Sequence, residues 1–500
     1  MIGILEKPFM TRRTLVVGLA LATALPVTAV PAAARESAAV TFPSAKFPLG
    51  TPAAPAKTHK AIGQGIDLYQ LTAGRSTDGY SVTVLMPSGR DYGRQETADA
   101  KAAEVEGAGL TPSVQKFVRP GVADAPSQEV FMVRVGMWSL DDKKKAEETV
   151  KQLKDAGIKA RVDYLGDDGG NTTGPWSMNV LMVDARRFRG SYRASVGASV
   201  AARETTSAMA KGVGAIAGVN GGFFNIHTSK ALRGDPLGAS VVAGKLLSEP
   251  VAGRSAIVIK GRKAAITELK AEITATGQNG SRQEIAGVNR PTAADELVLY
   301  TEEFGAKTPA DEGADVVLDA TGKVVALRAP GANIPKGHTV LHGVGGAADW
   351  LRENVLDGET VKVATKLTDL RTDKNIALTP DLNVVAGGVG LLRNRRVNVT
   401  AKRDGHDSVN MILRRHPRTM AGVTRNGGLI LATVDGRNPG VSVGANMIEA
   451  ARLMKWLGAV NAINLDGGGS TAMVVGNKVV NRPSDGAERP VGDALLVLPR

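Results

Sequence analysis

The clearest pattern of apolar and polar positions lies in the first third of the chain, where two strand-like runs flank a helix-like one. Residues 130–135 read as a strand, and residues 158–164 alternate as a second strand. Between them, Ala146, Val150 and Leu153 fall on one face at helical spacing. The pattern predicts a small β-α-β unit.

Strand patterns punctuated by glycine begin at Trp176 and predict the main domain. They fill 174–260 and return in 381–500, where residues 445–457 show a helical face. The intervening segment has strand runs of its own and predicts an inserted all-β or α+β domain. The predicted fold class is α+β: a Gly-rich mixed-sheet domain with helices, an inserted smaller domain, and a small N-terminal β-α-β module.

The N-terminus predicts export. Arg12 and Arg13 precede an apolar run at 15–30, and three alanines follow at 32–34, the pattern of a secretory signal peptide over 1–34. The arginine pair suggests twin-arginine export, and an uncleaved anchor helix is the alternative. No later stretch is apolar enough to span a bilayer. We therefore expect a secreted or cell-wall-associated protein.

These patterns divide the chain into seven segments. They are a signal peptide (1–34), a flexible linker rich in Ala, Pro, Thr and Lys (35–60), a strand-rich region (61–125), the β-α-β module (128–168), the main domain in two parts (174–260 and 381–500), and the inserted domain (261–380).

Composition narrows the classes of chemistry. The chain has no cysteine, which excludes disulfides, zinc–thiolate sites and cysteine nucleophiles. The net charge of +13 favours an anionic partner. Because the Lys and Arg residues are scattered, without a dense basic arm, the sequence argues against nucleic acid. An exported basic protein instead fits an anionic envelope polymer.

The strongest candidate for a functional loop is the run that follows an apolar strand at 460–463. It comprises Asp466, Gly467, Gly468, Gly469, Ser470 and Thr471. Three glycines let the backbone approach a ligand, and successive N–H groups can form a concavity for phosphate oxygens. The alternative is a tight turn in which the glycines serve geometry alone.

Other polar loops carry further candidates. Asp435 and Arg437 flank a glycine after a strand, and Arg418 starts another strand after His416. An arginine can bind a phosphate through two hydrogen bonds. Further candidates for substrate binding are Asn220, Gly221, Gly222, Asp235 and Arg489.

Taken together, these motifs resemble the phosphodiester glycosidase family. The resemblance is carried by residues 219–224, 417–419, 434–437, 464–471 and 481–485, which occur in the family's order. It covers roughly 174–258 and 381–500. The resemblance implies hydrolysis of the bond between a sugar's anomeric carbon and a phosphate, in a sugar-phosphate polymer or a cell-wall glycan.

The resemblance also implies roles for the candidates. Asp466 or Asp435 would act as base or nucleophile. Arg418 and Arg437, with the amides of 467–469, would hold the phosphate. Asn220 and Asp235 would position the sugar. The two aspartates could instead bind a divalent cation such as Ca²⁺ or Mg²⁺, so the metal requirement stays open.

Two further alternatives stay open. The module at 128–168 resembles a SPOR domain, a peptidoglycan-binding module, through Val133-x-Val135-Gly136-x-Trp138. The chain could therefore be a wall-binding protein with a vestigial glycosidase domain. It could also be a phosphodiesterase that cuts the P–O bond.

Overall fold

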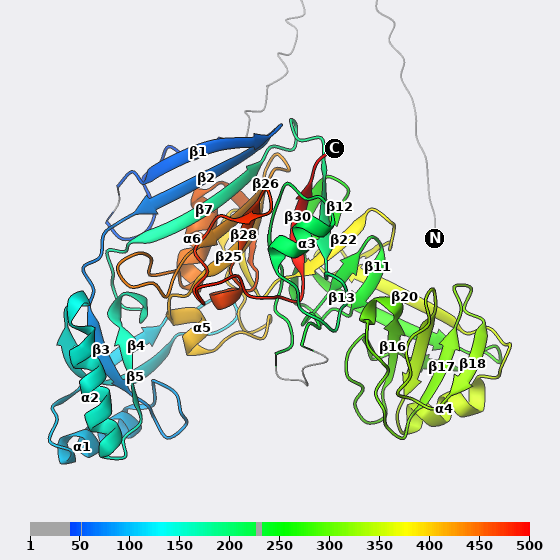
Figure 1. Cartoon of the computed structure of the whole chain (residues 1–500), viewed down its shortest axis with the longest axis horizontal. Helices are drawn as coiled ribbons and strands as arrows, with labels where there is room; N and C mark the ends of the chain where they lie inside the picture. The colour runs from blue at the N-terminus through cyan, green and yellow to red at the C-terminus, as the bar shows by residue number, and fades with distance from the viewer. Residues whose placement is uncertain (1–40, 52, 227–232) are drawn as a thin grey trace, which may run out of the picture. The chain divides into compact units, whose positions relative to one another are not determined.

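An antiparallel eight-stranded sheet collects strands from both ends of the chain. The computed structural model describes residues 41–51, 53–226 and 233–500, so the predicted signal peptide at 1–34 lies outside the described residues (Figure 1). The sheet comprises, in spatial order, β1 (Ala56–Gly63), β2 (Ile66–Ala73), β7 (Trp176–Val183), β26 (Leu429–Val434), β25 (Arg418–Thr424), β27 (Ala459–Asn464), β23 (Val389–Arg393) and β24 (Arg396–Val397). Because β2 pairs with β7, residues 74–175 are inserted between two sheet neighbours.

The helix predicted near 445–457 is confirmed as α6 (Met447–Trp456). Its capping box is complete, because Asn446 accepts from the Glu449 amide and Glu449 accepts from the Asn446 amide. Met447, Ala451 and Met454 are buried, and the helix packs on β23 and β27. This packing fixes the sheet at the ends of β25 and β27, where the candidate residues lie.

Two further sheets complete the glycine-rich part. One contains β11 (Lys245–Ser248), β10 (Ser240–Val242), β22 (Leu382–Ala386), β12 (Ser255–Lys260), β13 (Lys263–Thr276), β20 (Lys362–Asp369) and β21 (Lys374–Ile376), with β14 (Arg282–Glu284) paired to β13. The other contains β29 (Lys478–Val479), β28 (Met473–Val475), β9 (Ala217–Asn220), β30 (Ala494–Leu498) and β8 (Ser191–Ser195), with α3 (Thr206–Gly212) packed on it.

The predicted inserted segment contains a separate five-stranded sheet. Its members are β15 (Gly287–Val288), β16 (Leu297–Thr301), β19 (Thr339–Gly343), β17 (Ala314–Leu318) and β18 (Val324–Arg328), with α4 (Gly346–Asn354) against β19 and β17. The long strand β13 leads into it from the β12 hairpin, and β20 returns beside β13.

The predicted β-α-β unit is half of a larger one. Its strands are β5 (Gln128–Trp138) and β6 (Ala160–Tyr164), joined by α2 (Lys143–Asp155), on which Ala146 and Leu153 are buried. They share a sheet with β3 (Tyr80–Val84) and β4 (Pro112–Arg119), and α1 (Gln95–Gly107) connects the latter two. The strand order β4-β5-β3-β6 gives a split β-α-β-β-α-β arrangement. We call residues 80–164 the N-terminal module.

The predicted flexible linker is wrong for the part that the structure describes. Strand β1 already begins at Ala56, and Phe47 and Leu49 are buried. The Phe47 ring lies 5.7 Å from that of Trp176. A composition rich in small and polar residues concealed these isolated apolar anchors, whose burial stabilises the packed segment.

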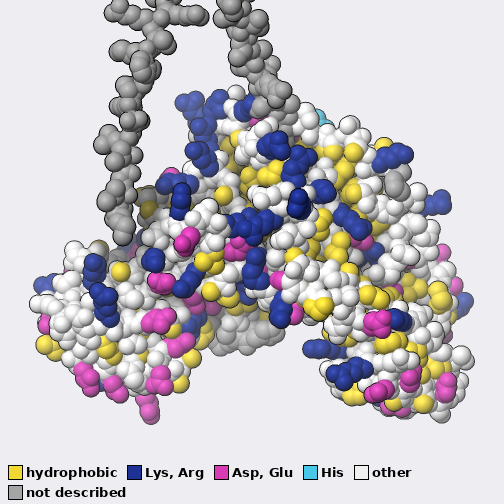
Figure 2. Space-filling view, turned by 180° about the vertical axis from the view of Figure 1, so that it is seen from behind, with side chains coloured by type: hydrophobic (Ala, Val, Ile, Leu, Met, Phe, Trp, Pro, Cys, Tyr) yellow, Lys and Arg dark blue, Asp and Glu magenta, His cyan; other side chains and the backbone are white. Residues whose placement is uncertain are grey.

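The composition of the structure confirms the α+β class. Helices account for 15% of the chain and strands for 40%, so sheets dominate with helices packed against them. Among the described residues, no helix is both long and apolar enough to cross a membrane. On the face drawn in Figure 2, Lys and Arg side chains are interspersed with acidic and uncharged ones.

Candidate active site

A cavity of about 300 Å³ gathers most of the predicted site residues. It is lined by Phe223, Ser408, Asn410, Met411, His416, Arg418, Arg437, Asp466, Gly467, Gly468, Gly469 and Arg489. Five segments that are far apart in the sequence therefore meet around one space. We call it the site cavity.

Strand register explains why these segments meet. Strand β25 starts at Arg418, which pairs with Val434 at the end of β26. On its other side β25 pairs with β27, and the Leu465 amide donates to Thr419 O at 2.8 Å. The start of β25 thus lies beside the ends of two antiparallel neighbours, so Arg437 and Asp466 emerge at the same edge of the sheet.

Arg418 is a buried cation whose described hydrogen bonds all go to neutral groups. Its Nε donates to Ala445 O at 2.9 Å and its Nη2 donates to Met411 O at 3.0 Å. In the part of the chain that the structure describes, its guanidinium forms no ion pair, although the charges of Glu449 and Asp466 act on it from farther away. Burial, reinforced by the charge of Arg437, lowers its pKa to about 9. A buried guanidinium held only by neutral groups is suited to an anionic ligand.

Asp466 supplies the acidic group of the cavity. The Gly467 amide donates to its Oδ1 at 2.8 Å, while burial raises its pKa to about 6. Its main chain is held by the strand end at β9: Asn220 Nδ2 donates to Asp466 O at 2.9 Å, and the Asp466 amide donates to Gly221 O at 2.9 Å. Contacts on both the amide and the carbonyl therefore fix the main chain of Asp466, and the Gly467 amide orients its carboxylate. The carboxyl group is ionised above about pH 6.

Asn220, predicted to position the sugar, is fully buried and does not line the site cavity. Its Oδ1 accepts from Thr419 Oγ1 at 2.6 Å and from the Ala472 amide at 3.1 Å. The side chain is fully buried and joins three chain segments. Gly221 and Gly222 do not line the site cavity either. Their amides donate to the carbonyl and to the carboxylate of Asp493, respectively.

Arg437 and His416 form one wall of the site cavity. Arg437 Nη2 lies 3.3 Å from His416 Nδ1, so that ring nitrogen accepts, and Nε2 faces the Asn410 side-chain oxygen at 3.2 Å. Burial, followed by the charges of Arg418 and Arg437, lowers the pKa of His416 well below its usual value. His416 is therefore neutral and orients the guanidinium.

The amides of the glycine loop, residues 467–471, mostly donate to acceptors within the protein. The Gly468 amide donates to Pro417 O at 2.9 Å, and the Ser470 and Thr471 amides donate back to Gly467 O and Gly468 O. The expected array of amides for phosphate is thus largely used within the protein. Ser470 and Thr471 are buried and do not line the site cavity, although the Ser470 side chain lies close enough to Asp466 to lower the pKa of that carboxyl.

Two of the glycines make room for neighbouring groups, a side chain at Gly469 and a main-chain carbonyl at Gly467. A Cβ on Gly469 would lie 2.0 Å from Arg489 Nη2, and a Cβ on Gly467 would lie 2.6 Å from Pro417 O. Arg489 is paired with Asp485 at 2.5 Å. Three guanidinium groups, those of Arg418, Arg437 and Arg489, line the site cavity.

Asp435 and Asp235 lie elsewhere. Asp435 accepts from Ser177 Oγ at 3.0 Å and from the Arg482 amide at 3.1 Å, and it lines a different cavity, of about 420 Å³. Asp235 is buried, which raises its pKa to about 8. Neither carboxylate lines the site cavity. The shared cation site suggested for Asp435 and Asp466 is thus not formed, and the described residues contain no cluster of three or more metal-ligating side chains.

Sequence reasoning missed Asp493. Burial raises its pKa to about 7, the Gly222 amide donates to its Oδ1 at 2.8 Å, and the nearby Asp466 charge favours its neutral form. It sits in an unremarkable Val-Gly-Asp-Ala run at the start of β30, where nothing local predicts a role. The segment 408–411 was missed for the same reason.

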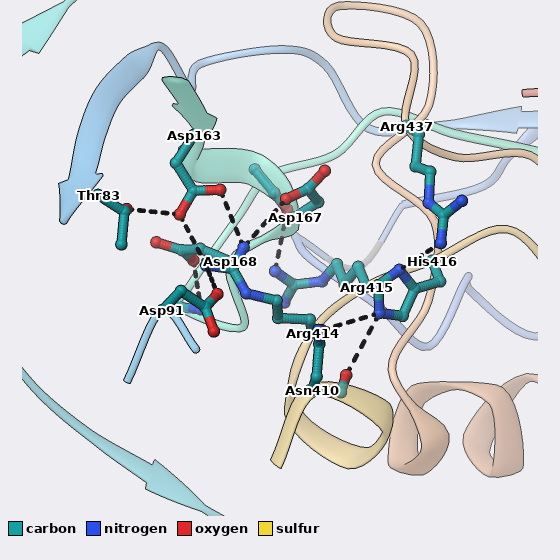
Figure 3. Close-up of polar contacts among 12 residues, drawn as sticks. Thr83, Asp91, Asp163, Asp167, Asp168, Asn410, Arg414, Arg415, His416 and Arg437 are labelled. Atoms are coloured by element: carbon teal, nitrogen blue, oxygen red, sulfur yellow. Dashed lines mark hydrogen bonds and ion pairs between the residues drawn. The ribbon is translucent and has the colours of Figure 1, made fainter. Parts of the chain in front are cut away.

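A buried charge cluster joins the site to the N-terminal module (Figure 3). Arg414 Nη2 lies 2.6 Å from Asp91 and 2.7 Å from Asp163. Arg134 adds contacts to Asp163 at 3.3 Å and Asp168 at 2.9 Å. The same chain segment that carries Arg414 carries His416, so the module helps to position one wall of the site cavity.

Arg415 continues this connection in the opposite direction. It forms a bidentate pair with Glu449 of α6, with distances of 2.7–3.0 Å, and donates to Gly166 O at 3.1 Å. The segment α5 (Val409–Leu413) and the residues up to His416 are thus held between α6 and the module.

Comparisons with known proteins agree with the motifs. Residues 312–498 match the model of the phosphodiester glycosidase family. That range includes Arg418, Arg437 and Asp466, and it also takes in part of the predicted inserted domain. The predicted resemblance to this family is confirmed.

Individual relatives cover different shares of the chain. N-acetylglucosamine-1-phosphodiester alpha-N-acetylglucosaminidase of Mus musculus is 33% identical over 119 residues, which is 22% of this chain and 22% of that protein. An uncharacterized SPbeta prophage-derived protein of Bacillus subtilis is 36% identical over 115 residues, 23% of this chain and 17% of that protein. The chain thus spans about a fifth of the curated relatives that it matches.

A solved structure matches almost throughout. A putative exported protein from Burkholderia pseudomallei superimposes with a TM-score of 0.81 and 29% identity, covering 92% of this chain and 99% of that one.

Proposed function

Because the chain carries a domain of the phosphodiester glycosidase family, we propose that it hydrolyses the bond between the anomeric carbon of a sugar and a phosphate in a phosphodiester. The family supports a glycosidase-like activity. The observation that carries the finer proposal is Arg418, a buried guanidinium that has no carboxylate partner among the described residues and faces the same cavity as Arg437 and Asp466.

Charge placement suits this reaction. A phosphate at Arg418 and Arg437 leaves as a stabilised anion, so expelling it requires little help from an acid. Asp466 is ionised near neutral pH and lies in the same cavity, where it can act on the developing oxocarbenium-like sugar or on a water molecule. Neutral His416 orients Arg437 rather than adding a third positive charge.

The test is release of sugar from a GlcNAc-1-phosphodiester in ¹⁸O-labelled water. Cleavage at the anomeric carbon places the label in the sugar. Label in the phosphate would instead mean that the chain is a phosphodiesterase. Binding of wall glycan without any release of sugar would favour the wall-binding alternative.

We further propose that the chain acts outside the cytoplasm. The pattern of residues 1–34 supports export, and the structural relative from Burkholderia pseudomallei bears the description of an exported protein. An envelope or extracellular glycan is then the substrate. The peptidoglycan-binding role suggested for 128–168 stays a prediction. Fractionation of cells that produce the full chain, with a variant in which Arg12 and Arg13 are both Lys, tests export.

A further inference from the structure

A two-residue link joins the buried carboxyl group of Asp493 to Asp466 in the site cavity. The Gly221 amide donates to Asp493 O at 2.8 Å, and the Gly222 amide donates to Asp493 Oδ1 at 2.8 Å. On the other side of the link, the Asp466 amide donates to Gly221 O at 2.9 Å. The two glycines therefore connect two residues that carry carboxyl groups.

Close packing explains why both residues of the link are glycines. A Cβ on Gly221 would overlap Asp493 Oδ1, and a Cβ on Gly222 would overlap a main-chain carbonyl oxygen of a neighbouring segment. Gly222 is followed by Phe223, which lines the site cavity. The position of Asp493 is thus passed to Asp466 and to Phe223 through the main chain.

The charges of the two carboxyl groups are coupled. Asp493 is buried, and its Oδ2 has no hydrogen-bond partner among the described residues. Burial, and then the charge of Asp466, raises the pKa of Asp493 to about 7, whereas the pKa of Asp466 is about 6. The pair therefore gains its first negative charge near pH 6 and its second near pH 7. Protonated on Oδ2, Asp493 still accepts from the Gly222 amide through Oδ1.

Neighbouring charges favour ionisation of Asp466 before Asp493. Arg489 and Arg418 both stabilise the carboxylate of Asp466. Within the described part of the chain, the charge that acts on Asp493 is that of Asp466, which opposes a second carboxylate. The first negative charge therefore belongs on the residue that faces the site cavity.

We propose that Asp493 is a positioning residue for Asp466, which it holds through the Gly221–Gly222 link while itself staying uncharged. This inference rests on the proposed function, because Asp493 does not line the site cavity and acts only through Asp466. An uncharged Asp493 leaves the pair with a single negative charge. A second charge would cancel part of the attraction that Arg418 and Arg437 exert on a phosphate.

Two substitutions of Asp493 separate its contacts from its charge. Asp493→Asn keeps an oxygen for the Gly222 amide, so kcat for a GlcNAc-1-phosphodiester at pH 6.5 should stay within threefold of the wild type. Asp493→Ala removes that acceptor and should lower kcat at least tenfold with less than a twofold change in KM, because the reacting carboxylate shifts while the arginines keep their positions.

Asp184→Ala is the matched control. Asp184 is also buried and accepts from one main-chain amide, that of Arg186 at 3.0 Å, but it does not line the site cavity. This variant should leave kcat unchanged. Equal losses of kcat in Asp184→Ala and Asp493→Ala would overturn the positioning role, because they would reflect the general loss of a buried acceptor.

A binding measurement tests the charge without requiring turnover. Sulfate keeps its charge between pH 5 and pH 8, and neither neutral His416 nor Arg418, whose pKa is about 9, titrates in the middle of this range. The affinity of the wild-type chain for sulfate, measured by calorimetry, should fall in two steps, near pH 6 and near pH 7. Asp493→Asn should keep the first step and lose the second, so that it binds sulfate at least threefold more tightly than the wild type at pH 8.

The two measurements fail independently. Asp184→Asn should follow the wild-type sulfate profile, and a second step that persists in Asp493→Asn would overturn the inference. If the wild-type chain hydrolysed no phosphodiester, the catalytic proposal would fall, while a second step lost only in Asp493→Asn would still support the coupled pair. If Asp493→Ala did not fold, the sulfate profile of Asp493→Asn would decide by itself.

Discussion

The most informative single residue is Arg418, because its environment is costly without a ligand. A buried charge with only neutral hydrogen-bond partners is less stable than a paired one, and natural chains keep such a charge where a ligand completes it. The lowered pKa of Arg418 has the same physical cause, because burial and the charge of Arg437 both disfavour the charged guanidinium. An anion in the site cavity would reverse this effect.

Arg418→Lys should weaken binding of inorganic phosphate about tenfold or more. Lysine cannot reproduce the planar fork that donates to Ala445 O, Met411 O and a ligand at once. Phosphate should raise the Tm of the wild-type chain in a concentration-dependent manner and that of the variant much less. The matched control is Arg452→Lys, an exposed arginine on α6. Equal phosphate affinity in the two variants would contradict the role of Arg418.

Asp466→Asn should lower kcat by about 10²–10⁴, the usual range for a positioned acid–base group. Because the pKa of Asp466 is about 6, the required carboxylate is present above that pH, and kcat/KM of the wild type should fall as pH decreases through 6. The pH profile with a GlcNAc-1-phosphodiester measures both points.

Asp435→Asn tests whether Asp435, like Asp466, is needed for turnover. Asp435 lines another cavity, so this variant should retain turnover within a few-fold. Its stability should fall by about 1–2 kcal/mol, because Asp435 accepts from Ser177 on one oxygen and from the Arg482 amide on the other, and asparagine keeps only one accepting oxygen. Loss of turnover in a fully folded Asp435→Asn protein would return Asp435 to the catalytic list.

At the scale of elements, the loop after β27 shows what sequence can and cannot predict. The glycine run, the flanking strands and the position of Asp466 directly after a strand were all predictable, because glycine and strand signals are local. The direction of the loop amides was not, since it depends on Pro417 O, which directly precedes β25 and is distant in sequence. Asp435 and Arg437 illustrate the same limit: two residues apart in the loop that follows β26, they line different cavities, and no local sequence signal predicts how that loop turns.

The N-terminal module shows which whole elements can be predicted from sequence and which pairings cannot. Strand β5, helix α2 and strand β6 were predictable from periodicity. The pairing of β3 between β5 and β6 was not, because it depends on contacts over some 50–80 residues of sequence. The helix α1 carries almost no amphipathic signal, since alanines and glutamates occupy most of its positions.

Gly469→Ala should raise KM for a phosphodiester with little change in Tm. The added Cβ would overlap Arg489 Nη2 and Asp485 Oδ2, which are the ends of flexible side chains and can move. Moving them displaces a guanidinium from the site cavity and leaves the fold intact. Gly107→Ala in α1 is the matched control, since its Cβ meets nothing within 4 Å. Unchanged KM in Gly469→Ala would show that Arg489 does not act on the substrate.

On the scale of the whole molecule, the buried charge cluster couples the N-terminal module to the segment that carries His416. Arg134, Arg161 and Arg414 face Asp91, Asp163, Asp167 and Asp168, so the acidic groups outnumber the basic ones. Arg414 lowers the pKa of Asp163 although burial opposes ionisation. Asp167 receives less compensation: burial and the charge of Asp163 raise its pKa to about 7.

The sign of the resulting pH dependence follows from linkage. A carboxyl whose pKa is higher in the folded state than in the unfolded chain binds more protons when folded, between about pH 4 and pH 7. The contribution of Asp167 to stability therefore falls as pH rises through that window, and the full cost is present above pH 7. Asp167→Asn should consequently stabilise the protein at pH 8 by about 2 kcal/mol and have little effect near pH 4. Urea unfolding of both proteins at the two pH values measures this difference, with Asp155→Asn on the surface of α2 as the control.

A stabilisation that is the same at both pH values would mean that Asp167 is not protonated in the folded cluster. Hydrogen exchange of the segment 409–416 would then show whether the same substitution loosens the wall that holds His416.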